Sequence, residues 1–178
     1  MLRKKAFSGI SLFFALVFMG ASLAVRADEL ETNLPPKKQI LFVCTGNFYR
    51  SRFAEALFNE KAGEAHLNWQ AYSRGLQLAS SQHGISPYSR QELIKRGVPK
   101  SYWSGVPKPL TREDLEKSDC IVLMDEAEHR PLLEKKFPVR DDRKIHYWHI
   151  AEAWKVKPAI SCQAMTKNVE QLLATLPR

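Results

Sequence analysis

Short apolar runs along this chain alternate with segments expected to be helical. Strands are predicted at residues 40–43, 67–73, 120–124 and 144–148, where the runs are short enough for buried strands. Helices are predicted over about 51–62, 87–97 and 126–137, with a short one after residue 111 and a closing one marked by apolar residues over 165–176. Because strand and helix alternate throughout, the pattern predicts an α/β layered fold around a parallel sheet, in which ligands bind beyond the carboxyl ends of the strands.

Helix-capping residues mark where two of these helices begin. Ser86 stands before Pro87, as an N-cap stands before a proline at the first helical position, and Gly97 marks the end of that helix. Thr111 and Asp114 have the spacing of a capping box. These signals supply helix boundaries that the apolar pattern alone leaves open.

The first residues have the pattern of a secretory signal peptide. Arg3, Lys4 and Lys5 precede an apolar run over 10–25, and cleavage fits after either Ala24 or Ala27. The run is shorter than the roughly 20 apolar residues that span a bilayer, which disfavours an uncleaved anchor. We therefore expect a signal peptide at 1–27, a linker at 28–38 and one domain at 39–178, in an exported protein, periplasmic or secreted, without a stable membrane anchor.

Composition and charge fit one globular domain. The chain has 178 residues, of which 44% are hydrophobic and 26% are charged, which is unlike a disordered chain. Loss of residues 1–27 removes four basic residues and no acidic one, so the net charge falls from +8 to +4. This mild positive excess suits anionic substrates or is an ordinary solvated surface, and nothing in it indicates nucleic-acid binding.

The three cysteines, Cys44, Cys120 and Cys162, have neither the spacing of a metal site nor that of a disulfide framework, so no metal site is predicted. An odd number leaves at least one free thiol, which in an oxidising compartment is a candidate for a reactive role. Cys120 lies in a predicted apolar strand and Cys162 on the closing helix, so both are interpreted as packing residues.

The segment from Cys44 to Ser51 carries the candidate chemistry. It joins a predicted buried strand to a predicted helix, so backbone amides and a helix N-terminus surround one point, where an anion is expected. Gly46 permits the dihedral angles of a tight loop, and Arg50 offers a planar pair of donors to two phosphate oxygens. The same donors favour the thiolate of Cys44, which makes it a nucleophile, and Ser51 can donate a hydrogen bond to the sulfur. Because a Cys-x5-Arg match alone is weak, a buried cysteine at a strand end is the alternative.

Motifs on both sides of the loop extend this signal. They are Ile40-Leu41-Phe42-Val43-Cys44-Thr45-Gly46-Asn47, Arg50-Ser51 and Ala54-Glu55-Ala56-Leu57, and more weakly Ser73-Arg74-Gly75, Leu110-Thr111-Arg112-Glu113-Asp114-Leu115 and Met124-Asp125. Together they resemble the low-molecular-weight protein tyrosine phosphatases over about residues 38–178. The resemblance implies a flavodoxin-like three-layer sandwich with a four-stranded parallel sheet, and phosphocysteine catalysis without metal or cofactor.

The resemblance also implies roles for individual residues. Cys44 would be the nucleophile, Arg50 the phosphate binder, and Asn47 and Ser51 supports of the loop. The family's acid is an aspartate followed by proline after the last strand, and Glu152 and Ala153 stand at the matching positions. Glu152 is therefore the expected acid, although its extra methylene group shifts the carboxyl and so affects its reach. The residues expected to bind substrate are Thr45, Gly46, Asn47, Phe48, Tyr49, Ser51 and Trp154.

Other positions depart from the family pattern as well. Tyr49 stands where many members carry a second cysteine that protects the nucleophile from overoxidation. Arg52 stands where proline is usual and is expected to add positive charge near the mouth of the site. Asp141 and Asp142 are fallback acids, but they precede the last strand and are expected at its wrong end.

These residues together predict an exported cysteine-dependent phosphatase that hydrolyses phosphotyrosine or other aryl phosphates. Phe48 and Trp154 offer aromatic faces that suit a phenyl ring, so the expected partner is a phosphorylated protein or a small aryl phosphate. The first alternative is a phospho-ligand binding module that has lost efficient chemistry. The second is an arsenate reductase, which needs further cysteines, and none occurs between Cys44 and Cys120.

Overall fold

The computed structural model describes residues 35–81, 83–138 and 142–177, and the chain separates into two units, Met1–Pro36 and Lys37–Arg178. The predicted signal peptide, most of the predicted linker and Asp141 lie outside the described residues. All the strands and helices described belong to the second unit.

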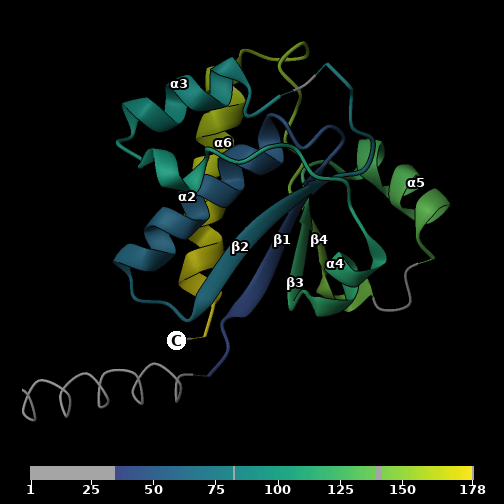
Figure 1. The fold of residues 1–178 in the computed structure, drawn as a ribbon, viewed down its shortest axis with the longest axis horizontal. Coiled ribbons are helices and arrows are strands. Elements are labelled where there is room, and N and C mark those ends of the chain that lie inside the picture. Colours follow the sequence, from purple (N-terminus) through teal and green to yellow (C-terminus); the bar gives the residue numbers. More distant parts are fainter. Residues whose placement is uncertain (1–34, 82, 139–141, 178) are drawn as a thin grey trace, which may run out of the picture. The chain divides into compact units, whose positions relative to one another are not determined.

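Four parallel strands form one sheet in the order β2-β1-β3-β4 (Figure 1). Their bounds are β1 Lys38–Cys44, β2 Trp69–Gly75, β3 Cys120–Leu123 and β4 Ile145–Tyr147. In the register of the sheet, Cys44 lies opposite Gly75 on β2, and Val43 lies opposite Leu123 on β3. The predicted parallel sheet is confirmed, and the carboxyl ends of the strands meet at one edge.

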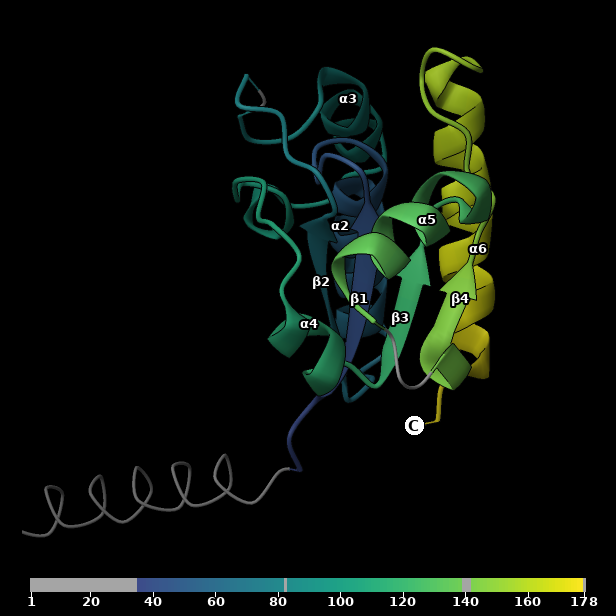
Figure 2. The same ribbon diagram turned by 90° about the vertical axis from the view of Figure 1, so that its right-hand side faces the viewer.

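Helices cover both faces of the sheet (Figures 1 and 2). One face carries α2 Arg50–Glu64, α3 Pro87–Lys95 and α6 Pro158–Thr175, and the other carries α4 Arg112–Lys117 and α5 Glu126–Lys136. Two short 3-10 helices, η1 Lys100–Tyr102 and η2 Asp142–Lys144, lie in the connections. The predicted flavodoxin-like three-layer sandwich is confirmed. Among the residues described, no helix is both long and apolar enough to cross a membrane.

Alternating side chains of the central strand β1 build two cores. Ile40 and Phe42 belong to the core shared with α2 and α6, whereas Leu41 and Val43 belong to the core beneath α4 and α5. All four side chains are fully buried. Because helices cover both faces, β1 is apolar and buried on both faces from Ile40 to Cys44, as expected for a central strand of a parallel sheet.

The predicted capping signals are confirmed at both helix starts. The Ser86 hydroxyl accepts a hydrogen bond from the Ser89 amide at 3.1 Å, and Pro87 is the first residue of α3. Thr111 and Asp114 form a capping box at the start of α4. Such caps typically stabilise a helix by about 1 kcal/mol. The caps also fix the residues at which the connections leading into α3 and α4 end. Those connections surround the candidate site.

Candidate active site

A cavity of about 310 Å³ opens at the carboxyl edge of the sheet, above the loop that joins β1 to α2. The residues that line it are Cys44, Thr45, Gly46, Phe48, Tyr49, Gln77, Ala79, Ser86, Pro87, Tyr88, Glu152, Ala153 and Trp154. Glu152 and Trp154 belong to the connection between β4 and α6, far along the chain from Cys44. The fold therefore brings the predicted nucleophile and the predicted acid to the same cavity.

The sulfur of Cys44 lies at the start of the loop, beside a hydroxyl group. The residue is 2% exposed, and its Sγ is 3.0 Å from Ser51 Oγ. Ser51 Oγ accepts a hydrogen bond from Asn47 Nδ2 at 3.1 Å, so the Ser51 hydrogen is free to point at the sulfur. The first turn of α2 contains no acidic residue, and Tyr49 at its N-cap forms no side-chain cap. These features favour an anion at the loop.

Asn47 fixes the shape of the loop. Its φ is 50°, which is the left-handed region, so the conformational freedom that we predicted for Gly46 is used by an asparagine. Its Nδ2 also donates to Ser73 Oγ at 2.7 Å, and its Oδ1 accepts from the Lys108 amide at 2.7 Å. Asn47 is fully buried, so it does not line the cavity and can act only through the loop.

The guanidinium of Arg50 is fully buried and carries several partners. Nη1 donates to Glu128 Oε2 at 3.0 Å and to the Ile150 carbonyl at 2.9 Å, while Nη2 donates to Glu128 Oε1 at 2.8 Å and to Glu152. Nε is buried without a protein partner. Burial by itself would lower the pKa of Arg50, but the hydrogen bond to Glu128 and the charges of Cys44 and Glu152 outweigh it and raise the pKa.

Glu128 and His129 are site residues that the sequence analysis missed. His129 is fully buried, its Nδ1 accepts from the Asp125 amide at 2.9 Å, and its Nε2 lies 3.4 Å from Glu128 Oε1. Burial would raise the pKa of Glu128, but hydrogen bonds from His129, Arg50 and Thr45 outweigh it and hold the pKa well below its usual range. Their place directly after Met124-Asp125, at the carboxyl end of a buried strand, is the signal that could have found them.

Glu152 reaches Arg50 although its side chain is one methylene group longer than the aspartate usual in the family. Its carboxylate forms an ion pair with Arg50 Nη2, and its side chain is 11% exposed. The same residue lines the cavity above Cys44. Asp142 begins η2 before β4, at the opposite end of that strand from this connection, as expected for a fallback acid at the wrong end.

The three predicted aromatic residues all line the cavity but differ in exposure. Phe48 is half-buried, and Trp154 is 76% exposed at the rim. Tyr49 is 6% exposed, and its hydroxyl donates to the Pro158 carbonyl at 3.1 Å, so this polar group is held at the start of α6. Burial and the neighbouring Cys162 raise the pKa of Tyr49. Tyr49 therefore contributes a ring to the wall and no free hydroxyl.

Arg52 does not lie at the mouth of the site, so this part of the sequence analysis was wrong. The residue is 7% exposed, and it is absent from the residues that line the cavity. Its guanidinium turns toward the segment after η1, where the carbonyls of Trp103 and Gly105 accept its hydrogen bonds. The apolar neighbours of Arg52 on α2 are buried, and the arginine is buried with them; backbone carbonyls accept from its Nη2, whereas its Nε has no protein partner among the described residues.

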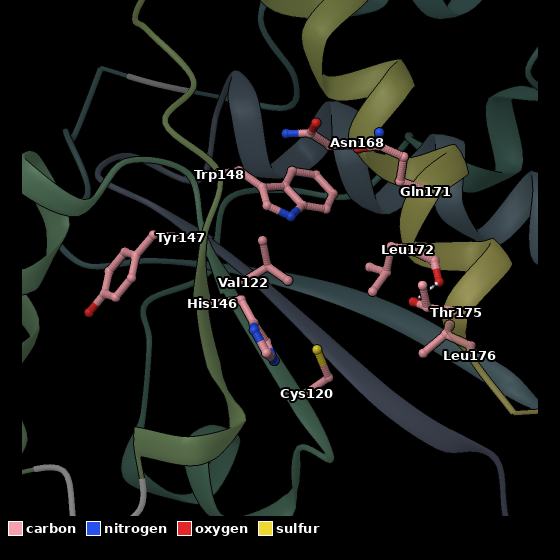
Figure 3. A pocket seen from close by; sticks show the side chains of 10 residues that line it. All are labelled: Cys120, Val122, His146, Tyr147, Trp148, Asn168, Gln171, Leu172, Thr175 and Leu176. Atoms are coloured by element: carbon pink, nitrogen blue, oxygen red, sulfur yellow. Dashed lines mark hydrogen bonds between the residues drawn. The ribbon is translucent and has the colours of Figure 1, made fainter.

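A larger hollow of about 680 Å³ lies elsewhere, between β3, β4 and α6 (Figure 3). Cys120, His146 and Trp148 line it together with residues of α6, and none of the predicted site residues does. Burial, with the charge of Asp119, raises the pKa of Cys120 to about 11, which fits a packing residue. Within the described part of the chain, no group of three or more His, Cys, Asp or Glu side chains is placed to hold a metal.

Comparison with known proteins assigns the chain to a family. A sequence profile described as low molecular weight phosphotyrosine protein phosphatase matches residues 39–157. The chain belongs to the low molecular weight phosphotyrosine protein phosphatase family. The crystal structure of the family member from T. tengcongensis superposes with a TM-score of 0.68 at 25% identity, over 79% of this chain and 100% of that one.

Curated relatives of this chain carry different activities in their names. The human low molecular weight phosphotyrosine protein phosphatase is 36% identical over 107 residues, 58% of this chain and 65% of that protein. The protein-arginine-phosphatase of Bacillus subtilis is 34% identical over 98 residues, 55% of this chain and 62% of that protein. Arsenate reductase 2 of Staphylococcus haemolyticus is 31% identical over 88 residues, 49% of this chain and 60% of that protein. The chain thus spans less than two thirds of the length of these relatives.

Proposed function

We propose that this protein hydrolyses phosphate monoesters through a phosphocysteine formed on Cys44. The observation that carries the proposal is the convergence of Cys44, Arg50 and Glu152 at one cavity, above a loop whose helix N-terminus is open to an anion. A phosphate there takes hydrogen bonds from the loop amides and from the unpartnered Nε of Arg50. No metal or cofactor takes part in this chemistry.

The reaction proceeds in two displacement steps. Cys44 attacks phosphorus in line, so a sulfur–phosphorus bond forms while the phosphorus–oxygen bond to the leaving group breaks, and Glu152 gives its proton to the leaving oxygen. Glu152 then takes a proton from a water molecule that attacks phosphorus, and the sulfur–phosphorus bond breaks to return the thiolate. Ser51 stabilises the departing sulfur through the 3.0 Å contact between Sγ and Oγ. Since Glu152 is bound to Arg50, it must leave that contact before it can meet the leaving oxygen.

Aromatic side chains around the cavity support an aryl phosphate as the substrate. Phe48, Tyr49, Tyr88 and Trp154 all line it, and a planar ring stacked among such side chains gains contact area while its phosphate reaches Cys44. The partner is then a protein that carries phosphotyrosine, or a small aryl phosphate. The signal-peptide pattern of residues 1–27 supports an exported, periplasmic or secreted enzyme. Cell fractionation, with mass spectrometry of the N-terminus for cleavage after Ala24 or Ala27, tests the location.

Turnover of p-nitrophenyl phosphate between pH 5 and 7 tests the reaction itself. We expect the wild type to release nitrophenol and the Cys44→Ser variant to release none. Acid quenching followed by mass spectrometry should trap phosphate on Cys44, and Glu152→Ala should change how much accumulates. A wild type no faster than Cys44→Ser removes the proposal.

The ion pair between Glu152 and Arg50 favours one second candidate, a phospho-ligand binding module. In that case Glu152 serves to orient Arg50 and never meets a leaving group, and the loop retains its affinity for phosphate without efficient chemistry. Tight binding of phosphotyrosine peptides with negligible turnover, unaffected by Glu152→Ala, supports the module. Turnover that depends on Glu152 supports the enzyme.

The arsenate-reductase alternative finds little support in the site. Such chemistry needs further reactive cysteines near the nucleophile, but Cys120 and Cys162 are both buried and neither lines the cavity. Burial raises the pKa of each thiol to about 11, which disfavours the thiolate. We expect no arsenate consumption that depends on a thiol reductant.

A further inference from the structure

Arg52 is a buried cation next to the loop from Cys44 to Ser51, called the phosphate loop from here on. The proposed chemistry does not use this arginine. Its side chain is 8% exposed, and its Nη2 donates to the Trp103 carbonyl at 3.1 Å and the Gly105 carbonyl at 2.7 Å. Its Nη1 lies 3.6 Å from a carboxylate oxygen of Glu55, one turn further along α2. A buried arginine with a carboxylate partner needs a structural or functional reason, because desolvation of the charge is costly.

Glu55 connects Arg52 to the nucleophile through a chain of hydrogen bonds. Ser73 Oγ donates to Glu55 Oε2 at 2.5 Å, and it accepts from Asn47 Nδ2 at 2.7 Å. The other hydrogen of that amide goes to Ser51 Oγ, which is 3.0 Å from Cys44 Sγ. Ser73 gives its hydrogen to Glu55 and therefore accepts from Asn47, whose amide in turn donates to the hydroxyl that faces the sulfur.

A second route leads from Arg52 to Asn47 along the backbone. The carbonyls that Arg52 binds belong to the segment that continues to Lys108, whose amide donates to Asn47 Oδ1 at 2.7 Å. A Cβ at Gly105 would lie 3.2 Å from Arg52 Nη1, so the glycine leaves the space that the guanidinium fills. The two routes meet at Asn47, the left-handed residue of the loop.

We propose that Arg52 is a positioning residue of the phosphate loop, acting on Asn47 through Glu55 and Ser73 and through the backbone of the segment that leads to Lys108. The proposal rests on the proposed phosphatase chemistry of Cys44. Arg52 touches neither substrate nor sulfur. It holds the asparagine amide in the one orientation that directs the Ser51 hydroxyl to the nucleophile and keeps the loop in shape for phosphate.

The Arg52→Met variant keeps the length of the side chain and removes its charge. We expect kcat/KM for p-nitrophenyl phosphate to fall about 10- to 100-fold, mostly in kcat, because small displacements of a reacting group have effects of that size. The affinity for vanadate, which needs the loop but no turnover, should fall as well. Arg52→Lys restores the charge without the two-pronged contact and should recover part of both losses.

Coupling to Glu55 distinguishes positioning from a general loss of stability. In a Glu55→Gln background, Arg52→Met should lower kcat/KM much less than it does in the wild type, because the two residues act through the same series of contacts. The matched control is Arg96→Met. It removes the ion pair between Arg96 and Glu92, which does not belong to the hydrogen-bond series from Glu55 to Cys44. It should lower the melting temperature without changing kcat/KM per folded molecule.

The result that overturns the proposal is an Arg52→Met protein with wild-type vanadate affinity and wild-type kcat per folded molecule, whatever its melting temperature. Effects of Arg52→Met and Glu55→Gln that simply add also count against it. If Arg52→Met does not fold, Arg52→Lys and Glu55→Gln carry the same comparison. A wild type that binds vanadate without turnover defeats the proposed function, whereas the positioning role is then decided by vanadate affinity alone.

Discussion

At the residue scale, the candidate site depends on a carboxylate that has two possible partners. Glu152 is bound to Arg50 in the structure, while acid catalysis requires it at the leaving oxygen. In the proposed reaction, we expect a phosphate bound at the free Nε of Arg50 to share the guanidinium with Glu152, weaken the ion pair at Nη2 and so free the proposed acid. We expect the longer side chain of glutamate, compared with aspartate, to allow both positions from one backbone site.

Glu152→Gln separates these two roles. We expect kcat to fall about 10²- to 10⁴-fold, with the larger loss for phenyl phosphate, because a poor leaving group depends more on proton donation than p-nitrophenol does. Vanadate should bind at least as tightly as to the wild type, because a negative charge next to the anion site is removed. Steady-state kinetics on both substrates, together with vanadate inhibition, measures these effects. An equal loss on the two substrates would contradict the assignment of Glu152 as the acid.

Gly75 shows how closely β2 approaches the phosphate loop. A Cβ at this position would lie 2.9 Å from the Thr45 carbonyl oxygen and 3.0 Å from the Asn47 amide, both of them backbone atoms of the loop. We expect Gly75→Ala to displace the loop and lower kcat/KM about 100-fold, with a loss of about 1–3 kcal/mol in the free energy of unfolding. Enzyme kinetics and urea denaturation report the two effects.

The control for that substitution is Gly63→Ala on α2. A Cβ there meets the Tyr102 hydroxyl at an ordinary 3.5 Å, and alanine is the better helix former by about 1 kcal/mol. Its activity should stay at the wild-type level and its stability should not fall. A Gly75→Ala variant that behaves like Gly63→Ala would show that the close approach is not required.

At the element scale, the short helix α4 is anchored by one buried carboxylate. Asp114 is 3% exposed, completes the capping box with Thr111, and accepts from Arg74 Nε at 3.0 Å. Burial would raise the pKa of Asp114, but hydrogen bonds from Thr111 and Arg74 outweigh it and lower the pKa below its ordinary 3.8. The carboxylate therefore contributes stability above that ordinary value, and the contribution is lost as pH falls through the lowered pKa.

Asp114→Asn should lower the free energy of unfolding by about 1.5 kcal/mol at pH 7, because hydrogen bonds to a charged group are lost. The difference from the wild type should begin to shrink as pH falls below the ordinary pKa of 3.8 and should be gone only below the lowered pKa, where Asp114 is protonated in the folded wild type also. Urea denaturation at several pH values measures it. The exposed Glu113, replaced by glutamine, is the control and should change stability by less than about 0.5 kcal/mol at any pH.

Helix α5 contributes to the site through its first turn. Asp125 caps it by accepting from the Glu128 amide at 2.9 Å, and this places Glu128 and His129 against Arg50. The sequence signal after Met124-Asp125 places Glu128 at the edge of the sheet but does not pair it with Arg50, because the two are 78 residues apart and meet only when β1 and β3 pair in parallel. The same holds for Arg52 and the carbonyl of Gly105, 53 residues away. An arginine on a predicted amphipathic helix is normally assigned to the solvent, so its burial could not be predicted.

At the scale of the whole molecule, the second unit contains all the described secondary structure and both cores. We expect a chain that starts at Lys37 to have the melting temperature and the activity of the longer protein, because it keeps every residue of β1. A chain that starts at Phe42 loses half of the central strand, and we expect it not to fold. Circular dichroism with thermal melting compares the two. A Lys37 chain that fails to fold contradicts the assignment of the domain.

The sequence by itself determined the order of the elements and the chemistry of one loop. These are local features: the short apolar runs that predict strands, the capping residues at fixed spacing, and the Cys44-to-Ser51 segment. Each depends only on residues that are close together in the chain, so it can be recognised from the sequence alone. The tertiary structure decided which groups surround that loop: the partners of Arg50, the burial of Arg52, and the chain from Glu55 to Asn47. Those contacts join residues from different strands and helices, and their energies depend on burial and distance, which exist only once the sheet has formed.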